Sequence, residues 1–146
     1  MSKTEAAMAL HGSGCNCAQC VLCVFAPELG MEEETAMRVA TGFGAGMGRM
    51  AATCGAVTGA FMVLGLFHGM RRAGEPAAKE TTYERVLEFS RRFRQKHSTL
   101  TCRDLLGVDV GTEEGMKAAR EGKLFATLCS GFIRDAVEIL ESMTGS

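Results

Sequence analysis

The chain has 146 residues, enough to bury the core of one domain without disulfides or metals, and we expect a single domain over residues 1–146. Its 16 basic and 17 acidic residues leave a net charge of −1, which excludes a strong field for nucleic acid or an anionic membrane. The chain begins without an apolar signal segment, and its seven cysteines, an odd number, do not fit a closed disulfide framework. We therefore expect a cytoplasmic protein whose thiols are reduced or reversibly oxidised.

Apolar stretches of helical length alternate with turn residues along the chain, and no run has the period of a strand. These features predict an all-α protein, a single-domain helical bundle of about six to eight helices. The segment 51–67 carries no charge but is short for a membrane span, and its glycines and Thr58 favour a buried helix, so no transmembrane segment is expected. The predicted helices span residues 4–10, 17–25, 31–43, 54–69, 78–97, 102–106, 113–120 and 123–143.

Three cysteines follow residues that commonly cap helix N-termini. The first turn of a helix offers unpaired N–H groups and partial positive charge, which favour a thiolate and lower its pKa below the usual value of about 8.5. Gln19 and Asp104 stand three residues after two of these caps, which is capping-box spacing. Cysteine would also suit a helix start simply as a small apolar residue. The pairs of cap and cysteine are Asn16 with Cys17, Thr53 with Cys54, and Thr101 with Cys102.

A glycine cluster precedes the second of these helix starts. It lacks the third glycine of a dinucleotide fingerprint, because Met47 takes that place, and it lacks the lysine of a phosphate loop, because Arg49 follows the last glycine. We interpret it as a helix end and a tight connection that brings backbone close to Cys54. Cys129, by contrast, lies within an apolar helical stripe, which taken alone indicates a buried core thiol. The four glycines are Gly42, Gly44, Gly46 and Gly48.

The cysteines and glycines form a longer pattern: NCAQ at residues 16–19, the glycine cluster, CGAVTG at 54–59, CRDLL at 102–106 and finally Cys129. Over nearly the whole chain this pattern resembles the C_GCAxxG_C_C family of putative redox-active proteins. The resemblance implies a small helical protein with a redox role. It also implies four signature cysteines, which here are Cys17, Cys54, Cys102 and Cys129.

The chain departs from the simpler family pattern by adding Cys15, Cys20 and Cys23 around Cys17. On a helix Cys17 and Cys20 are neighbours, as are Cys20 and Cys23, whereas Cys17 and Cys23 are roughly 120° apart. Two dithiol pairs can therefore form, but one ion cannot bind all three sulfurs of an intact helix. Alternatively, Cys20 and Cys23 simply fill the apolar face of the helix.

The first functional hypothesis is reversible thiol–disulfide chemistry at one partly buried site between the Cys54 helix and the Cys129 helix. Cys54 or Cys17 would be the activated thiolate, another signature cysteine would resolve it, and Arg49 or Arg103 would supply positive charge. We expect Cys54 to be the most acidic thiol, because it begins the longest uncharged helix. The candidate catalytic residues are Cys54, Cys17, Cys102 and Cys129.

The alternative is a cysteine-ligated metal ion or iron–sulfur cluster, bound by the same four cysteines and extended by Cys15 and Cys20. Covalent c-type haem is not expected, since no histidine follows either Cys-x-x-Cys sequence. A third hypothesis is an interaction module that uses the basic segment 91–97, although nearby glutamates offset its charge. The expected partner is a redox protein or a small thiol rather than nucleic acid, and self-association into a homo-oligomer stays open.

Overall fold

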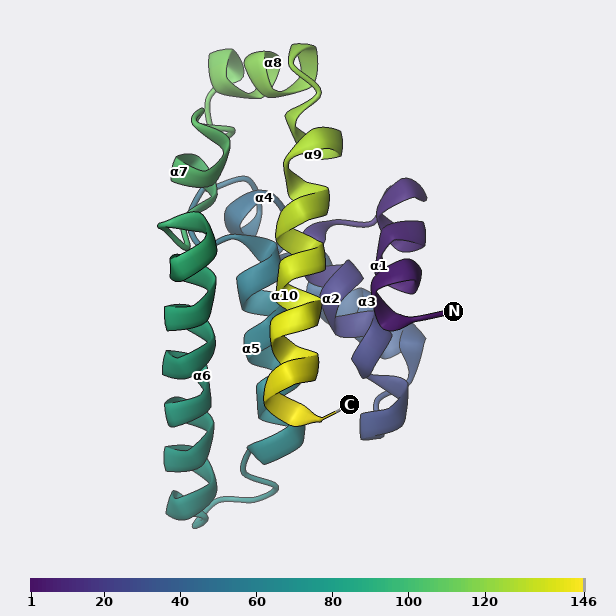
Figure 1. Ribbon diagram of the computed structural model, residues 1–146, viewed down its shortest axis with the longest axis vertical. Coiled ribbons are helices and arrows are strands. Elements are labelled where there is room, and N and C mark those ends of the chain that lie inside the picture. Colours follow the sequence, from purple (N-terminus) through teal and green to yellow (C-terminus); the bar gives the residue numbers. More distant parts are fainter. Residues whose placement is uncertain (146) are drawn as a thin grey trace.

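The computed structural model describes residues 1–145, and their secondary structure is helical, as the sequence predicted (Figure 1). The predicted helices are present with ends that differ by at most two residues, except that the last is interrupted at Leu128. The β-structure of the described chain is one isolated antiparallel bridge between Thr53 and Thr101. The α-helices are α1 (Lys3–Gly12), α2 (Cys17–Phe25), α3 (Glu33–Thr41), α4 (Gly44–Met47), α5 (Gly55–His68), α6 (Pro76–His97), α7 (Cys102–Leu106), α8 (Glu113–Glu121), α9 (Leu124–Thr127) and α10 (Cys129–Thr144), with a 3-10 turn at Pro27–Leu29.

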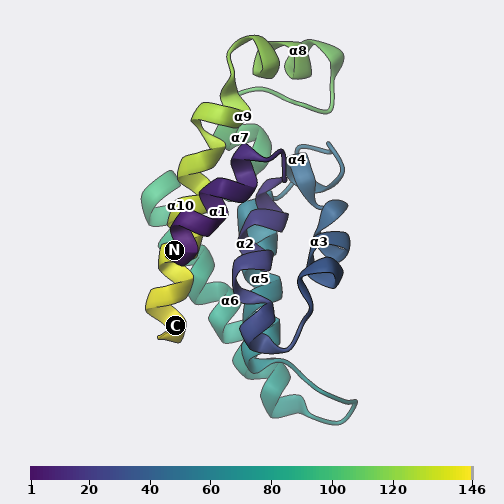
Figure 2. The same cartoon turned by 90° about the vertical axis from the view of Figure 1, so that its right-hand side faces the viewer.

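Helix α5 is the central helix of the bundle. It packs against α2, α6 and α10, while α1 and α3 cover α2 (Figures 1 and 2). Most of its first half is buried, together with Val63 and Leu64, which confirms the prediction that the uncharged segment 51–67 forms a core helix. No helix within residues 1–145 is both long enough and apolar enough to cross a bilayer.

Glycines allow α2 and α5 to approach closely. A Cβ on Gly59 would lie 2.9 Å from the Ala18 oxygen, and one on Gly55 would lie 3.1 Å from the Cys17 Cβ. Both distances are shorter than ordinary van der Waals contacts between carbon and its neighbours. The two helices therefore bring their N-terminal ends, and with them two signature cysteines, to the same place in the fold.

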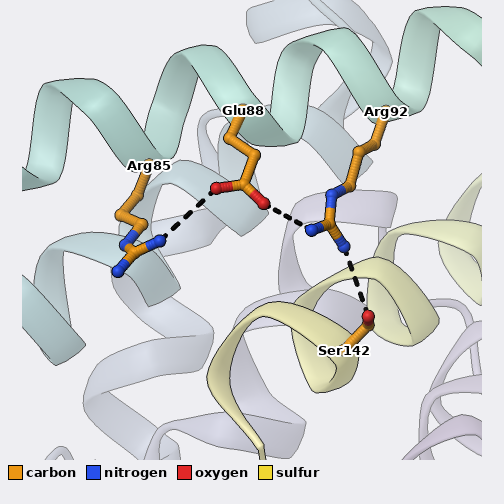
Figure 3. A network of polar contacts seen from close by, with 4 residues as sticks. All are labelled: Arg85, Glu88, Arg92 and Ser142. Atoms are coloured by element: carbon orange, nitrogen blue, oxygen red, sulfur yellow. Dashed lines mark hydrogen bonds and ion pairs between the residues drawn. The ribbon is translucent and has the colours of Figure 1, made fainter.

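Polar contacts tie α6 to α10 on the outer side of the bundle (Figure 3). Glu88 accepts from Arg85 at 3.4 Å and from Arg92 one turn further along, both on α6. Arg92 also donates to the Ser142 hydroxyl on α10 at 3.2 Å. None of these residues lines the thiol pocket described below. Helices α7, α8 and α9 form the opposite end of the molecule from the loop between α5 and α6, beside α4 (Figure 1).

Candidate functional site: a pocket of four thiols

Backbone pairing places Cys54 beside Cys102. The Cys54 N–H donates to the Leu100 oxygen at 2.8 Å, and the Cys102 N–H donates to the Ala52 oxygen at 2.6 Å, on either side of the β-bridge. The prediction that Thr53 caps the following helix is wrong, because Thr53 is held in the bridge and Cys54 itself is the N-cap of α5. This one-residue difference turns the Cys54 side chain toward the free N–H groups of the helix.

The environment of Cys54 favours its thiolate. The Cys17 thiol and the backbone N–H groups of Ala56 and Val57 in the first turn of α5 lie near the Cys54 sulfur and favour its charged form, although the side chain makes no capping hydrogen bond. These contacts, with that of Cys17 the strongest, lower the pKa of Cys54 although burial opposes the shift. The direction agrees with the expectation for Cys54, whereas the ranking of all seven thiols stays a prediction.

Cys17 is the partner thiol, positioned by a capping box. The Asn16 side chain accepts from the Gln19 N–H, and the Gln19 side chain accepts from the Asn16 N–H, each at 2.9 Å, which confirms the predicted helix start. The Cys17 thiol lies within hydrogen-bonding reach of the sulfurs of Cys129 and Cys54, and these contacts, followed by burial, raise the pKa of Cys17 well above its usual value. Where Cys54 is ionised, Cys17 therefore keeps its proton.

Cys102 begins α7 as predicted, but its cap differs from the prediction. The Thr101 side chain makes no capping hydrogen bond, so the expected capping box with Asp104 is wrong. Asp104 instead accepts from the Thr99 hydroxyl at 3.3 Å. Burial, followed by the charges of neighbouring groups, raises the pKa of Cys102 to about 12. Cys102 is thus held as a neutral thiol on the wall of the site.

Cys129 lies at a helix start that the sequence did not predict. The Leu128 N–H donates to the Leu124 oxygen at 2.9 Å and closes α9, while the Leu128 oxygen accepts from Gly131 at 3.1 Å and Phe132 at 3.4 Å and opens α10. The predicted continuous helix over 123–143 is therefore wrong at this point, because the hydrogen-bond ladder is interrupted. Cys129 becomes the first residue of α10, buried at 6 % exposure as expected but directed to the site.

The glycine cluster forms a tight connection, as interpreted, but its backbone is left-handed. Such a backbone costs roughly 1–2 kcal/mol at each non-glycine residue, and glycine avoids that strain. Backbone hydrogen bonds hold the turn, among them one from the Ala52 N–H to the Gly46 oxygen at 2.9 Å. A Cβ on Gly46 would meet the Ala52 nitrogen at 2.6 Å. The consecutive positive φ angles are 54° at Ala45, 69° at Gly46, 68° at Met47, 60° at Gly48 and 70° at Arg49.

The four signature cysteines line one cavity of about 800 Å³, a size typical of small-molecule sites. The structure therefore brings together all four residues that the sequence singled out, and their chemical role stays a prediction. Arg49, which the sequence analysis proposed as a source of positive charge, also lines the pocket from the left-handed turn. Two further lining residues were not assigned to this site from sequence. They are His11 from α1 and Arg120 from α8. No local motif marks these residues, because only the tertiary contacts of separate segments assemble them.

The additional cysteines divide between the pocket and the core. Cys15 is half-buried on the pocket wall, with its sulfur 3.8 Å from the Met37 sulfur. Cys20 and Cys23 are buried in the hydrophobic core, in line with the apolar-face alternative. Burial is the main cause that raises the pKa of Cys20 to about 12 and that of Cys23 to about 11. Neither buried thiol lines the pocket.

The predicted metal ligands other than Cys20 share the pocket without forming a ready coordination sphere. All seven cysteines are free thiols. Within residues 1–145, no three His, Cys, Asp or Glu side chains are grouped as a metal site. Binding by Cys17, Cys54, Cys102 and Cys129, with or without Cys15 and Cys20, would therefore require these side chains to move.

Fold and site together define a class: a small all-α protein with thiols from several helix starts around one pocket. A family model described as "Putative redox-active protein (C_GCAxxG_C_C)" matches residues 15–143. The chain belongs to this family, as its sequence pattern suggested. No curated protein and no solved structure gives a significant match.

Proposed function

We propose that the protein carries out reversible thiol–disulfide exchange, with Cys54 as the nucleophile and Cys17 as the resolving cysteine. The observation that carries this proposal is the setting of the Cys54 sulfur, which lies on the pocket wall, at the head of α5 and against the Cys17 thiol. A thiolate is the attacking species in disulfide exchange, and helix N–H groups stabilise it. Membership of a family described as redox-active supports the same class of chemistry.

The exchange proceeds in two displacements. The Cys54 thiolate attacks one sulfur of a substrate disulfide, forms a mixed disulfide and releases the other half as a thiolate, which takes a proton from water. Cys17 then attacks the Cys54 sulfur, the Cys17–Cys54 disulfide forms, and the second substrate thiol leaves with the Cys17 proton. Two electrons pass from the protein thiols to the substrate disulfide. A dithiol reductant restores the protein by the same exchange in reverse.

The contacts of Cys17 link the two steps. Cys129 and then Cys54 raise the pKa of Cys17 while all three are thiols or thiolates. Formation of the mixed disulfide removes the negative charge of Cys54, and with it one cause of the raised pKa. Cys17 therefore loses its proton more readily after the first step than before it, which is the order that resolution requires.

The first test is site-resolved alkylation with iodoacetamide across a range of pH. Because the pKa of Cys54 is lowered, its thiolate persists to a lower pH than an ordinary thiol, and its rate falls only as pH drops through the lowered pKa. We expect Cys54 to be the fastest thiol, with a midpoint below about 8.5. A midpoint at or above that value, or Cys54 as the slowest thiol, would overturn the proposal.

The second test maps the sulfur bonds that form with bis(2-hydroxyethyl) disulfide. We expect a Cys17–Cys54 disulfide in the unaltered protein, a stable mixed disulfide on Cys54 in Cys17→Ser, and neither product in Cys54→Ser. Cys15→Ser, which alters another pocket cysteine, is the control and keeps the Cys17–Cys54 disulfide. A disulfide between Cys54 and Cys102 would contradict the assignment of Cys17.

Elemental analysis separates this function from the metal hypothesis. Untagged protein purified without oxygen should contain no stoichiometric metal and should show titratable thiols. Stoichiometric zinc, iron or copper would make the four cysteines ligands instead and would contradict the exchange mechanism.

A further inference from the structure

The thiol pocket is lined by two arginines that form no ion pair with another residue of the described chain. Arg49 and Arg120 line it, and no aspartate or glutamate does. Elsewhere in residues 1–145, arginine side chains that make ion pairs do so within the α6 network, where Arg85 and Arg92 share Glu88. Neither pocket arginine takes part in an ion pair within the described chain. Two arginines that form no ion pair within the described chain thus belong to the cavity wall.

The Cys54 thiolate does not account for this charge. Its pKa is lowered by the Cys17 thiol and by the Ala56 and Val57 amides, and Arg49 and Arg120 are not among the causes. The sequence-based hypothesis that Arg49 or Arg103 activates the thiolate is therefore not the explanation that the structure supports, and Arg103 does not line the pocket. The charge of the two pocket arginines is available to another anion.

Backbone conformation and packing between two segments determine where both arginines lie. Arg49 has a φ of 70°, a strained value for a residue with a side chain, and strain of this kind tends to gather at functional sites. A Cβ on Gly111 would lie 2.9 Å from the Arg49 oxygen, so the segment leading into α8 packs against the left-handed turn. Helix α8 in turn carries Arg120. The two arginines therefore come from segments that contact each other.

The arginines and the thiols occupy different depths of the cavity. Both arginines are exposed, whereas Cys54, Cys102 and Cys129 are buried. Positive charge therefore lies on the solvent side and the sulfurs lie behind it. His11 adds a further unengaged group, because its Nδ1 atom is buried without a hydrogen-bond partner within residues 1–145. A ligand that enters this pocket meets the two arginines before it meets the buried sulfurs.

We propose that the pocket selects an anionic small disulfide, whose carboxylate groups pair with Arg49 and Arg120 while its sulfur faces Cys54. Guanidinium groups recognise carboxylates through paired hydrogen bonds. They also offset the repulsion between an anionic substrate and the anionic nucleophile. The inference rests on the exchange function proposed above and adds its substrate class. The covalent steps are those of that exchange.

The test compares exchange rates with three disulfides that differ in charge: 3,3′-dithiodipropionate with two carboxylates, bis(2-hydroxyethyl) disulfide with none, and cystamine with two ammonium groups. The readout is the ratio of the anionic to the neutral rate. Arg49→Gln and Arg120→Gln should each lower this ratio about five-fold, and the double variant about twenty-fold, since electrostatic steering changes rates by roughly ten-fold or more. The ratio of the cystamine rate to the neutral rate should stay constant or rise in these variants.

The matched control is Arg91→Gln, which removes the same charge from an exposed position on α6 that does not line the pocket. It should leave all three rates within about two-fold, as expected when exposed charges are farther apart than the Debye length of roughly 10 Å. As a second measurement without variants, the ratio of iodoacetate to iodoacetamide alkylation at Cys54 should fall as salt rises.

The outcomes separate the two proposals. If the double variant keeps the neutral exchange rate and the ratio of the anionic to the neutral rate does not change, the proposed anionic substrate class is wrong. The exchange function itself is not contradicted by that result. Slow reaction of Cys54 with the neutral disulfide in the unaltered protein overturns the exchange function. A fall in the anionic ratio with the neutral rate preserved supports both.

Discussion

Cys54 and Cys20 are almost equally buried, at 4 % and 0 % exposure, yet their pKa values shift in opposite directions. Cys54 stands before the first turn of α5, where the donor groups of Cys17 and two amides lower its pKa. Cys20 lies inside α2, where burial, followed by the charges of Cys15 and Cys23, raises the pKa to about 12 and outweighs the opposing effect of its own backbone N–H. The difference teaches that access to hydrogen-bond donors, rather than burial, decides which thiol of this protein can ionise.

The largest expected effect is the difference in alkylation rate between Cys54 and Cys20. At pH 7.5 Cys54 should be alkylated at least about 1,000-fold faster than Cys20, because even an ordinary thiol, with a pKa of about 8.5, is ionised roughly that much more than one with a pKa of about 12, and the pKa of Cys54 is lowered. Mass spectrometry of peptides after timed iodoacetamide treatment measures both rates in one sample. Rates within ten-fold of each other would mean that the two environments do not differ as described.

The next largest effect comes from disturbing the close packing of α2 against α5, which brings Cys17 near Cys54. Gly59→Ala places a Cβ 2.9 Å from the Ala18 oxygen, so we expect a loss of about 2–3 kcal/mol of unfolding free energy and slower alkylation of Cys54. Gly65→Ala is the matched control on the same helix, since nothing lies within 4 Å of its Cβ. It should gain about 0.5–1 kcal/mol, as measured by urea denaturation.

A smaller effect is the pH dependence of stability that the buried thiol of Cys20 causes. The raised pKa of Cys20 means that the folded protein keeps a proton that the unfolded chain loses above about pH 8.5. The contribution of Cys20 to the free energy of unfolding is therefore fully present below that pH. It falls as pH rises toward 12, by roughly 1.4 kcal/mol per pH unit. Urea denaturation in reductant between pH 8 and 10 measures the slope. Cys20→Ala should make it shallower, and an unchanged slope would refute this account.

The smallest effect concerns the ion pairs of Glu88 on α6, whose residues do not line the thiol pocket. Glu88→Gln weakens the contacts of Glu88 with Arg85 and Arg92 on α6 and should cost about 0.5–1 kcal/mol of unfolding free energy, as is usual for half-exposed ion pairs. Thermal or urea denaturation measures this loss. Alkylation of Cys54 should not change. A changed alkylation rate would show that the pocket depends on the outer face of the bundle.

Much of the fold could be predicted because its signals are local. Helices α2 and α7 begin and end where the sequence predicted, and the Asn16–Gln19 capping box forms within four residues of chain. The absence of charge in segment 51–67, together with its glycines, identified α5 as a core helix. The signals that made these predictions possible therefore lie within a few residues of each helix.

The wrong predictions share one cause. Thr53 is drawn into a bridge with Thr101, and the helix over 123–143 is interrupted at Leu128. A cap propensity or an apolar stripe cannot report such interactions, because each depends on the surrounding tertiary contacts rather than on neighbouring residues. The left-handed φ of Arg49 is of the same kind, since a side chain adopts it only where surrounding structure imposes it.

The sequence by itself determined the helical class, most helix positions and the four signature cysteines, because periodicity, caps and motif spacing act over a few residues. The sequence also predicted one common thiol site, whereas tertiary structure decided that Cys17 lies beside Cys54 and that His11 and Arg120 line the same pocket. The physical reason is that hydrogen bonds between thiols and the charge around a sulfur act through space. Residues far apart in the chain supply them only after α2, α5 and α10 have packed.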